Sequence, residues 1–307
     1  MNRIRGVVAA VATPVDDDFA PDVDRLVAHS RWLLANGCDG LNVLGTTGGF
    51  ASFSAAQRVR VMRALAESGL PLGTMMVGTG TAAFEDTVAL TNTAVETGFA
   101  GALVIPPFYY KNVTEDGVFA YFARVIDAVG EARLRLYLYN FPAMSGVPFT
   151  VPLVARLVEA YPGVVVGLKD SSNDAAYVAA LHEAFPDLDV FPSSESVLAN
   201  ARRAGYAGCI SATANVTSAL AARVWSGDDD VQPALAAIRE AIASVPLIAA
   251  CHHLVGEMHG DPAWRRVPPP LYPLDEREIA RLHGALAPSA FGRYADALST
   301  RAARSGA

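Results

Sequence analysis

The sequence predicts a (β/α)₈ TIM barrel followed by a C-terminal α-helical extension. Eight short apolar segments alternate with longer segments whose apolar residues recur every three to four positions. The short segments are almost continuously apolar, which is typical of parallel strands covered on both faces. A doubly wound fold would carry a phosphate-binding loop after its first strand, and the chain has no GxxxxGK[ST] motif. We therefore place the catalytic barrel in residues 1–226 and the extension in residues 227–307.

The predicted strands are short runs rich in apolar and β-branched residues. They begin at Gly6, Gly40, Leu72, Gly101, Arg135, Val164, Asp189 and Gly208. The segments between them have the apolar spacing of helices, for example "VDRLVAHSRWLLANG" from Val23 and "SAAQRVRVMRALAESG" from Ser54. Three junctions share a Gly-x-x-Gly pattern before the strand, and their first glycines (Gly37, Gly98 and Gly205) suit the left-handed position that ends a helix. This weak internal repeat is consistent with stacked βα units.

The C-terminal extension is expected to be helical throughout. The segment "VQPALAAIREAIASVPLIAACHHLVGEMHG" precedes a Pro-rich bend, and a last helix begins at Asp275, where Glu278 completes a capping box. His252, His253 and Glu257 lie close together in the first segment, but their spacing does not fit HExxH and they lie outside the predicted barrel mouth. We therefore expect an amphipathic helix with exposed histidines there, and no metal site.

Charge and composition exclude several classes of partner. The net charge is −7 and no basic stripe occurs, which argues against nucleic acid or an anionic membrane as a partner. No apolar stretch reaches the roughly 18 residues that a membrane span needs, and the N-terminal apolar run is too short for a signal peptide. The three cysteines have no CxxC spacing, so we expect a reduced, cytoplasmic protein without disulfides.

The carboxyl ends of the predicted strands hold the candidate chemistry, because active sites of such barrels lie there. Lys169, one of only two lysines in the chain, ends the apolar run of the sixth strand. Desolvation in an apolar pocket disfavours the charged form of a lysine, so its free amine can attack a ketone, whereas an arginine stays protonated. Tyr139, one strand away, could relay protons, and the hydroxyls and N–H groups of "GTTG" could bind a carboxylate. No pair of carboxylates and no metal-ligand spacing occurs at these strand ends.

These motifs resemble those of the dihydrodipicolinate synthase/N-acetylneuraminate lyase family of class I aldolases. The matching pieces are "GTTG" (45–48), "PPFYY" (106–110), "YNFPAMSG" (139–146), "GLKDSS" (167–172) and "GCISATANV" (208–216). The resemblance implies a Schiff base between Lys169 and a 2-oxo acid, usually pyruvate, which reacts with an aldehyde. It also implies that Tyr139 is the proton-relay phenol and that Thr46 and Thr47 are the carboxylate and relay hydroxyls.

The same resemblance implies further site residues and an assembly. Tyr110 would be a catalytic tyrosine that reaches the site of a neighbouring subunit, in a homotetramer built from tight dimers. Ile210 would line the pyruvate pocket, and Gly48 belongs to the substrate-binding GTTG turn. The family needs no metal and no organic cofactor.

Two positions depart from the family pattern. Gly49 stands where the family turn has Glu, and Met144 stands where the dihydrodipicolinate synthases carry an Arg that holds the carboxylate of the aldehyde. The loss of such a charge-assisted contact would cost on the order of 1.5–3 kcal/mol of binding. The seventh strand reads "PSSES", where the neuraminate lyases have a "GYDE"-type stretch for sugar hydroxyls. We expect specificity to depend on Met144, Ser171 and Ser193, and the sequence leaves the aldehyde open.

Three functions are compatible with these residues. The first is an aldolase or lyase that acts on a 2-oxo acid, and the second is a dehydratase or hydratase-aldolase that acts on a 2-oxo sugar acid through the same imine. The third is a catalytically silent barrel that binds a metabolite. Lys169, Tyr139 and the threonine pair favour the two enzymes, and the sequence leaves the direction of the reaction open.

Overall fold

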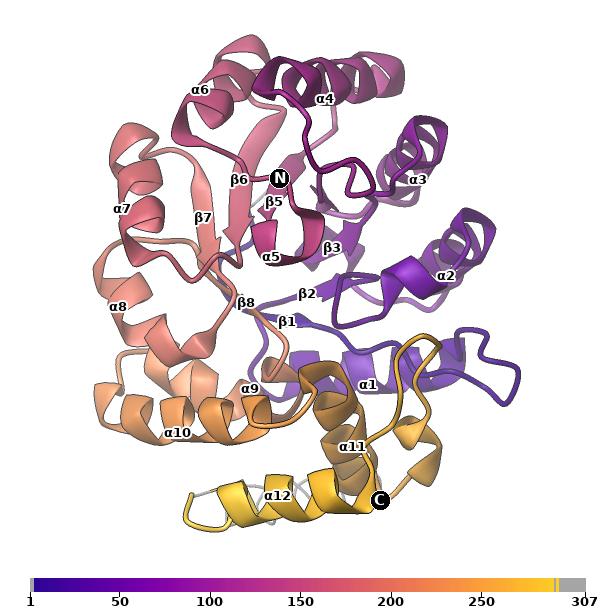
Figure 1. Cartoon of the computed structure of the whole chain (residues 1–307), viewed down its shortest axis with the longest axis vertical. Coiled ribbons are helices and arrows are strands. Elements are labelled where there is room, and N and C mark those ends of the chain that lie inside the picture. Colours follow the sequence, from indigo (N-terminus) through magenta and orange to yellow (C-terminus); the bar gives the residue numbers. More distant parts are fainter. Residues whose placement is uncertain (1–2, 290, 293–307) are drawn as a thin grey trace.

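The computed structural model of the 307-residue chain describes residues 3–289 and 291–292. The predicted extension therefore ends outside the described residues. Eight parallel strands form the centre of the molecule, and helices surround them (Figure 1). The strands are β1 (Gly6–Ala10), β2 (Gly40–Val43), β3 (Met75–Gly78), β4 (Gly101–Val104), β5 (Leu136–Asn140), β6 (Val165–Asp170), β7 (Asp189–Pro192) and β8 (Gly208–Ser211).

The strands pair in the order β7-β6-β5-β4-β3-β2-β1-β8. A backbone hydrogen bond of 3.0 Å from the N–H of Ala207, just before β8, to the carbonyl of Val190 in β7 joins the two outer strands. The barrel is therefore nearly closed, and the predicted fold class is confirmed. Its interior is filled by side chains from all around the sheet, including Val8, Met76, Leu103, Tyr137 and Ile210.

The helices that cover the barrel begin and end where local sequence dictates. They are α1 (Val23–Ala35), α2 (Ala55–Glu67), α3 (Phe84–Thr97), α4 (Glu115–Val129), the short α5 (Pro142–Ser145), α6 (Val151–Ala160), α7 (Ala175–Ala184), α8 (Leu198–Arg203) and α9 (Ala214–Trp225). The helices predicted from Val23 and Ser54 are confirmed, with Ser54 as the N-cap of α2. The three junction glycines have φ between 82° and 102°, as predicted.

The third strand differs from the prediction at its start. Residues Leu72–Thr74 form a 3₁₀ turn, η2, and β3 begins only at Met75. The cause is local, because the backbone N–H and the hydroxyl of Thr74 both donate to the carbonyl of Pro71, at 2.8 and 2.9 Å. These bonds hold the segment in a turn and prevent extended pairing before Met75.

The extension consists of α10 (Gln232–Ala243), α11 (Leu247–His259), η5 (Pro262–Arg265) and α12 (Glu276–Leu286). The predicted capping box at Asp275 and Glu278 is present, with hydrogen bonds of 2.8 and 3.0 Å. The expected helical run breaks before α11, because Pro246 has no N–H to continue the ladder of α10. Side chains of α10, α11 and α12 share one apolar core with β1, β2 and α9, so the extension packs directly on the barrel.

No single helix among residues 3–289 has the length and apolar composition of a membrane span. The segments Asp229–Ala243 and Leu247–His259 meet that test only as a pair, and they are bent by 111°.

His252 and His253 of α11 are buried, so the prediction that they are exposed is wrong. His252 and His253 are 1% and 4% exposed. The helix packs against α9 and α10 on one side and η5 on another, where Nδ1 of His252 lies 3.1 Å from the carbonyl of Trp264. Burial lowers the pKa of His252 to about 4. Amphipathic spacing could not reveal that η5 covers the polar side of this helix.

Candidate active site

Lys169 and Tyr139 lie side by side inside the barrel. β5 and β6 pair with Tyr139 opposite Lys169, so strand alternation turns both side chains inward. The Nζ atom of Lys169 is 4.5 Å from the centre of the Tyr139 ring, and both residues are only 4% exposed. The next pair along the strands, Asn140 and Asp170, faces outward and forms a hydrogen bond of 2.7 Å. The register therefore delivers an amine and a phenol to one buried point and directs the neighbouring carboxylate away from it.

The GTTG turn after β2 adds a hydroxyl to this pair. The Oγ1 atom of Thr46 is 3.2 Å from the phenol oxygen of Tyr139, which links the turn to the phenol. Thr47 is buried beside it, with 6% exposure. A Cβ atom on Gly48 would lie 2.7 Å from Oγ1 of Thr13 and 3.0 Å from the carbonyl oxygen of Val11, so only glycine permits this close packing on β1.

A cavity of about 480 Å³ opens at the carboxyl ends of the strands and brings most of the predicted site residues together. The predicted residues that line it are Thr46, Thr47, Tyr139, Met144, Lys169, Ser171, Ser193 and Ile210. A second cavity of about 410 Å³ adjoins it and shares Asn173 and Ser193 with it. The second cavity therefore meets the first at Asn173 and Ser193.

Two predicted residues do not line this cavity. Gly48 packs against Val11 and Thr13 on the side of the turn away from the cavity, so it allows the backbone of the turn to lie close to them and does not line the cavity. Tyr110 lies on the loop between β4 and α4, is 72% exposed, and forms an edge-to-face pair with Tyr109 with ring centres 5.2 Å apart. Its expected role in a neighbouring subunit stays a prediction.

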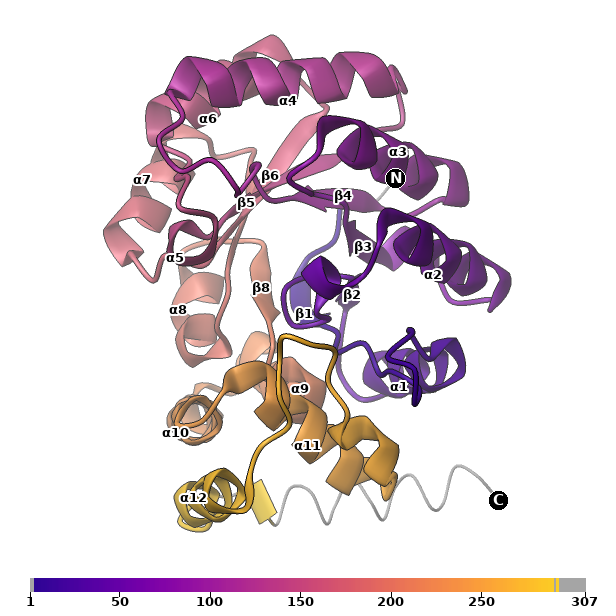
Figure 2. The ribbon, with the colours of Figure 1, turned by 45° about the vertical axis from the view of Figure 1, so that its right-hand side comes forward.

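The outer wall of the cavity comes from the extension, which the sequence analysis did not include in the site. In Figure 2 the loop between η5 and α12 reaches up to the strand ends. The contributing residues are Arg239 of α10, Pro246 to Ala249 at the start of α11, Pro270 to Pro273 of the loop, and Glu278 of α12. They lie in segments without a motif, and only the packing of the extension on the barrel brings them to Lys169.

Arg239 is positioned through a buried carboxylate. Glu195, which follows β7, is fully buried and accepts hydrogen bonds from the hydroxyls of Ser211, Thr213 and Thr217, the last at 2.9 Å. The guanidinium of Arg239 contacts the hydroxyl of Thr213 at 3.4 Å. Besides Lys169, Arg239 is the only basic residue among those that line the larger cavity, and Glu278 is the only acid. The cavity thus has an amine deep inside and a guanidinium at its outer wall.

The two family departures have structural counterparts. Gly49 has φ of 64°, and a Cβ atom there would lie 3.1 Å from Cγ of Pro268, in the loop that leads to α12. The extension therefore occupies the space that a longer side chain at position 49 would need. Met144 is 60% exposed on α5 at the cavity rim, and the cation that its position lacks is provided at another point of the wall by Arg239.

Comparison with known proteins identifies relatives along nearly the whole chain. The model of the dihydrodipicolinate synthetase family matches residues 3–256. An uncharacterized DapA-like lyase of Chloroflexus aurantiacus is 34% identical over 93% of this chain and 97% of its own length. An N-acetylneuraminate lyase of Citrobacter koseri is 33% identical over 69% of this chain and 70% of its own length.

Solved structures give the same picture. The crystal structure of dihydrodipicolinate synthase from Agrobacterium tumefaciens matches with a TM-score of 0.87 and 30% identity, and covers 92% of this chain and 99% of that chain. The structure of YagE from Escherichia coli K12, in complex with pyruvate, matches with a TM-score of 0.82 and 26% identity, over 92% of this chain and 98% of that one.

Proposed function

The chain belongs to the dihydrodipicolinate synthetase family, and from this premise we propose that it is a class I aldolase whose Lys169 forms a Schiff base with pyruvate or another 2-oxo acid. The observation that carries the proposal is the buried pairing of Lys169 with Tyr139, with Nζ 4.5 Å from the centre of the ring. An amine and a phenol in an apolar barrel interior are the groups that imine formation and proton relay require.

We propose the following role for each residue. The uncharged amine of Lys169 attacks the keto carbon, and the carbinolamine that forms loses water to give the imine. Tyr139 transfers protons to and from the departing oxygen, and Thr46, 3.2 Å from the phenol oxygen, is the next member of the relay. The N–H groups and hydroxyls of the GTTG turn, with Thr47 buried beside the pair, bind the carboxylate of the 2-oxo acid. Loss of a proton from the adjacent carbon gives an enamine, which forms a C–C bond with an aldehyde; cleavage follows the same path in reverse.

We propose that the second substrate is polar and carries an anionic group far from its reacting carbon. Ser171 and Ser193 line the cavity between Lys169 and the exterior and offer hydroxyls to a polyhydroxylated chain. Arg239 lies in the outer wall, and a guanidinium binds carboxylates and phosphates in a bidentate manner. Met144 leaves the rim of the cavity without the cation expected of a dihydrodipicolinate synthase, so the anion is expected nearer to α10.

We further propose that the protein acts in the cytoplasm as a homotetramer, a dimer of dimers, in which Tyr110 reaches the neighbouring site. The 72% exposure of Tyr110 and its place on a loop outside its own cavity support this role. An exposed aromatic pair such as Tyr109 and Tyr110 is a common feature of a contact surface.

The test is borohydride reduction in the presence of pyruvate, followed by peptide mass mapping. We expect a reduced pyruvate adduct on Lys169. The only other lysine, Lys111, provides a matched control: its amine is engaged by the carbonyls of Phe108 and Ser145 and lies outside the cavity lining. Lys169→Arg should abolish trapping, whereas Lys111→Arg should leave it unchanged. A folded protein that forms no adduct on Lys169 contradicts the aldolase and favours a silent metabolite-binding barrel.

A further inference from the structure

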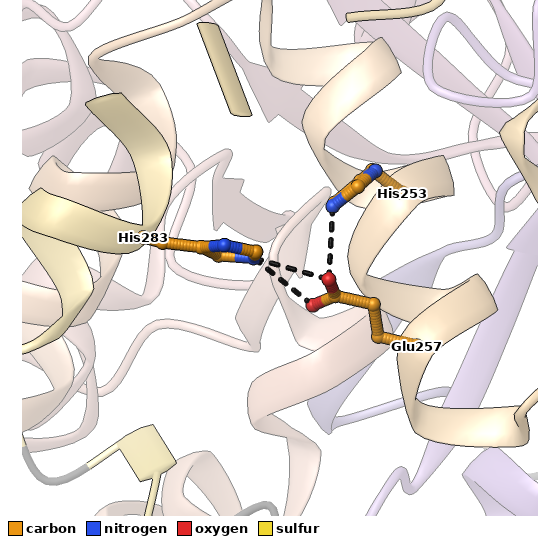
Figure 3. Close-up of side chains that lie close together, drawn as sticks. All are labelled: His253, Glu257 and His283. Carbon is orange, nitrogen blue, oxygen red and sulfur yellow. Dashed lines mark hydrogen bonds and ion pairs between the residues drawn. The ribbon is translucent and has the colours of Figure 1, made fainter. Parts of the chain in front are cut away.

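We propose that His253, Glu257 and His283 form a binding site for a divalent transition-metal ion at the junction of α11 and α12. Figure 3 shows His253 above and His283 to the left of the Glu257 carboxylate, with dashed lines from a nitrogen of each ring to its oxygens. His253 and Glu257 come from one face of α11, four residues apart, and His283 comes from the last turn of α12. None of the three lines the catalytic cavity, so the site is separate from the aldolase chemistry.

The ligand atoms already have the compactness of a metal site. Nε2 of His253 is 3.0 Å from Oε1 of Glu257, and Nε2 of His283 is 3.1 and 3.2 Å from the two carboxylate oxygens. One ligand atom from each residue can be chosen so that all three lie within 4.8 Å of one another. In a tetrahedral zinc site, with bonds of about 2.0–2.2 Å, ligand atoms are roughly 3.3–3.5 Å apart. The nitrogen–oxygen distances would therefore need to lengthen by only a few tenths of an ångström to suit a bound ion.

The donor set favours transition metals over calcium and magnesium. Two imidazole nitrogens and one carboxylate oxygen suit zinc, cobalt, nickel or copper, whereas calcium and magnesium prefer all-oxygen sites. Binding requires both imidazoles to be neutral, so that each Nε2 presents a lone pair in place of the proton that it now shares with Glu257. The three cysteines do not compete, because all are buried and burial raises the pKa of each thiol.

The three ligands differ in exposure, because His253 is buried whereas Glu257 and His283 are accessible to solvent. The His253 side chain is 4% exposed, and those of Glu257 and His283 are 37% and 46% exposed. An ion can therefore enter from solvent and meet an imidazole that is fixed by packing, with a further coordination position open to water. The two rings are 5.6 Å apart, centre to centre, and inclined by 48°.

The place of the site in the fold defines its role. The start of α11 and the loop before α12, with Glu278 in the first turn of α12, form the outer wall of the catalytic cavity. An ion shared by His253 and His283 would join the two helices through coordinate bonds that are stronger than the present hydrogen bonds. We infer a structural ion that holds α12 against α11 within the extension, with no part in bond making.

The experiment uses the full chain without a histidine tag, stripped with a chelator and then titrated with Zn²⁺ by calorimetry and with Co²⁺ by visible absorption. We expect one equivalent to bind, and the thermal midpoint to rise when Zn²⁺ is added. His283→Gln and Glu257→Gln should each weaken binding by about a hundredfold or more, since loss of a ligand exceeds the 10–100-fold effect of losing a ligand's support. His182→Gln, on α7, is the control and should bind like the unmodified chain.

Equal affinity of the unmodified chain and His283→Gln would overturn the proposal, as would weaker binding in His182→Gln alone. Thermal midpoints measured without metal separate a loss of ligand from a loss of fold, and two independent ligand variants keep the result decisive if one of them unfolds. Borohydride trapping of pyruvate should succeed in the metal-free protein, because the site does not contact Lys169.

Discussion

The barrel mouth and the C-terminal extension contribute to one cavity in different ways. At the mouth, Lys169 and Tyr139 are neighbours because two strands pair in register, and the geometry follows from backbone hydrogen bonds. In the extension, Arg239 and Glu278 come from two separate helices, and side-chain packing alone places them in the wall. The mouth is rigid because it belongs to the sheet, whereas the wall depends on how well α10, α11 and α12 pack.

This difference implies that the barrel mouth carries out the chemistry and that the extension determines the specificity for the second substrate. The groups that make and break bonds belong to the sheet, where an error of one residue in register would turn Lys169 away from Tyr139. The groups that meet the far end of the second substrate lie on the extension, which can change its loops and helices without disturbing the sheet. Variants of the two regions should therefore affect different kinetic constants.

Tyr139→Phe should give the largest effect among the variants that retain the Schiff-base lysine. Without the phenol the proton relay is lost, and we expect kcat to fall by about 10²–10⁴-fold while pyruvate binding changes little. Steady-state kinetics and borohydride trapping measure the two effects separately. Tyr161→Phe, which removes a surface phenol that bonds to Asp127, is the control and should retain full activity. An equal loss of pyruvate binding and turnover would show that Tyr139 has only a packing role.

Arg239→Leu tests the other side of the comparison. We expect KM for an anionic aldehyde to rise by about tenfold to a hundredfold, which corresponds to the roughly 1.5–3 kcal/mol of a charge-assisted contact, with pyruvate trapping unchanged. KM for a neutral aldehyde should stay the same. Arg239→Lys should recover part of the affinity, because it restores the charge without the bidentate geometry. If Arg239→Leu affects neutral and anionic aldehydes alike, the wall does not select by charge.

The fold and the centre of the site could be predicted because their signals are local. A strand shows itself by a short apolar run, and its last residues lie at the barrel mouth, so the places of Lys169, Tyr139 and Thr46 followed from position. The roles expected of Tyr139 and Thr46 came from the family resemblance. Arg239 could not be found in this way, since nothing near it in the sequence indicates that α10 packs against α9 and residues 195–197. His283 likewise joins Glu257, 26 residues earlier, only through the packing of α12 on α11.

The errors have the same origin. His252, which was expected to be exposed, is buried where it contacts Trp264 of η5, and Trp264 lies 12 residues further along the chain. The predicted turn at "GTTG" was right, but the reason for Gly49 became visible only with Pro268 in contact. Packing between distant segments determines the exposure and the residue type at such positions. The spacing of residues within a single segment carries no information about that packing.

Acidification should weaken the attachment of the extension to the barrel. His29 of α1 contacts His259 of α11 at 3.0 Å and Asn215 of α9 at 3.0 Å, and burial lowers its pKa to about 3. Because the unfolded chain binds this proton near pH 6.5, stability is lost as the pH falls below that value. At pH 5 the loss attributable to His29 is about 2 kcal/mol. Urea unfolding at pH 7 and pH 5 measures it, and His29→Gln should show a smaller pH dependence than His182→Gln.

The smallest expected effect concerns one contact between the two regions, at Gly49. Its φ of 64° costs a residue with a Cβ atom about 1–2 kcal/mol, and the new atom would also lie 3.1 Å from Pro268. Gly49→Ala should therefore lower the free energy of unfolding by about 1–2 kcal/mol, as measured by urea denaturation. Gly69, which also has positive φ but no atom within 4 Å of an added Cβ, provides the control. If Gly49→Ala loses more free energy of unfolding than Gly69→Ala, the excess measures the contact with Pro268. Equal losses would mean that the loop before α12 moves away freely. In that case only the backbone conformation requires glycine at position 49.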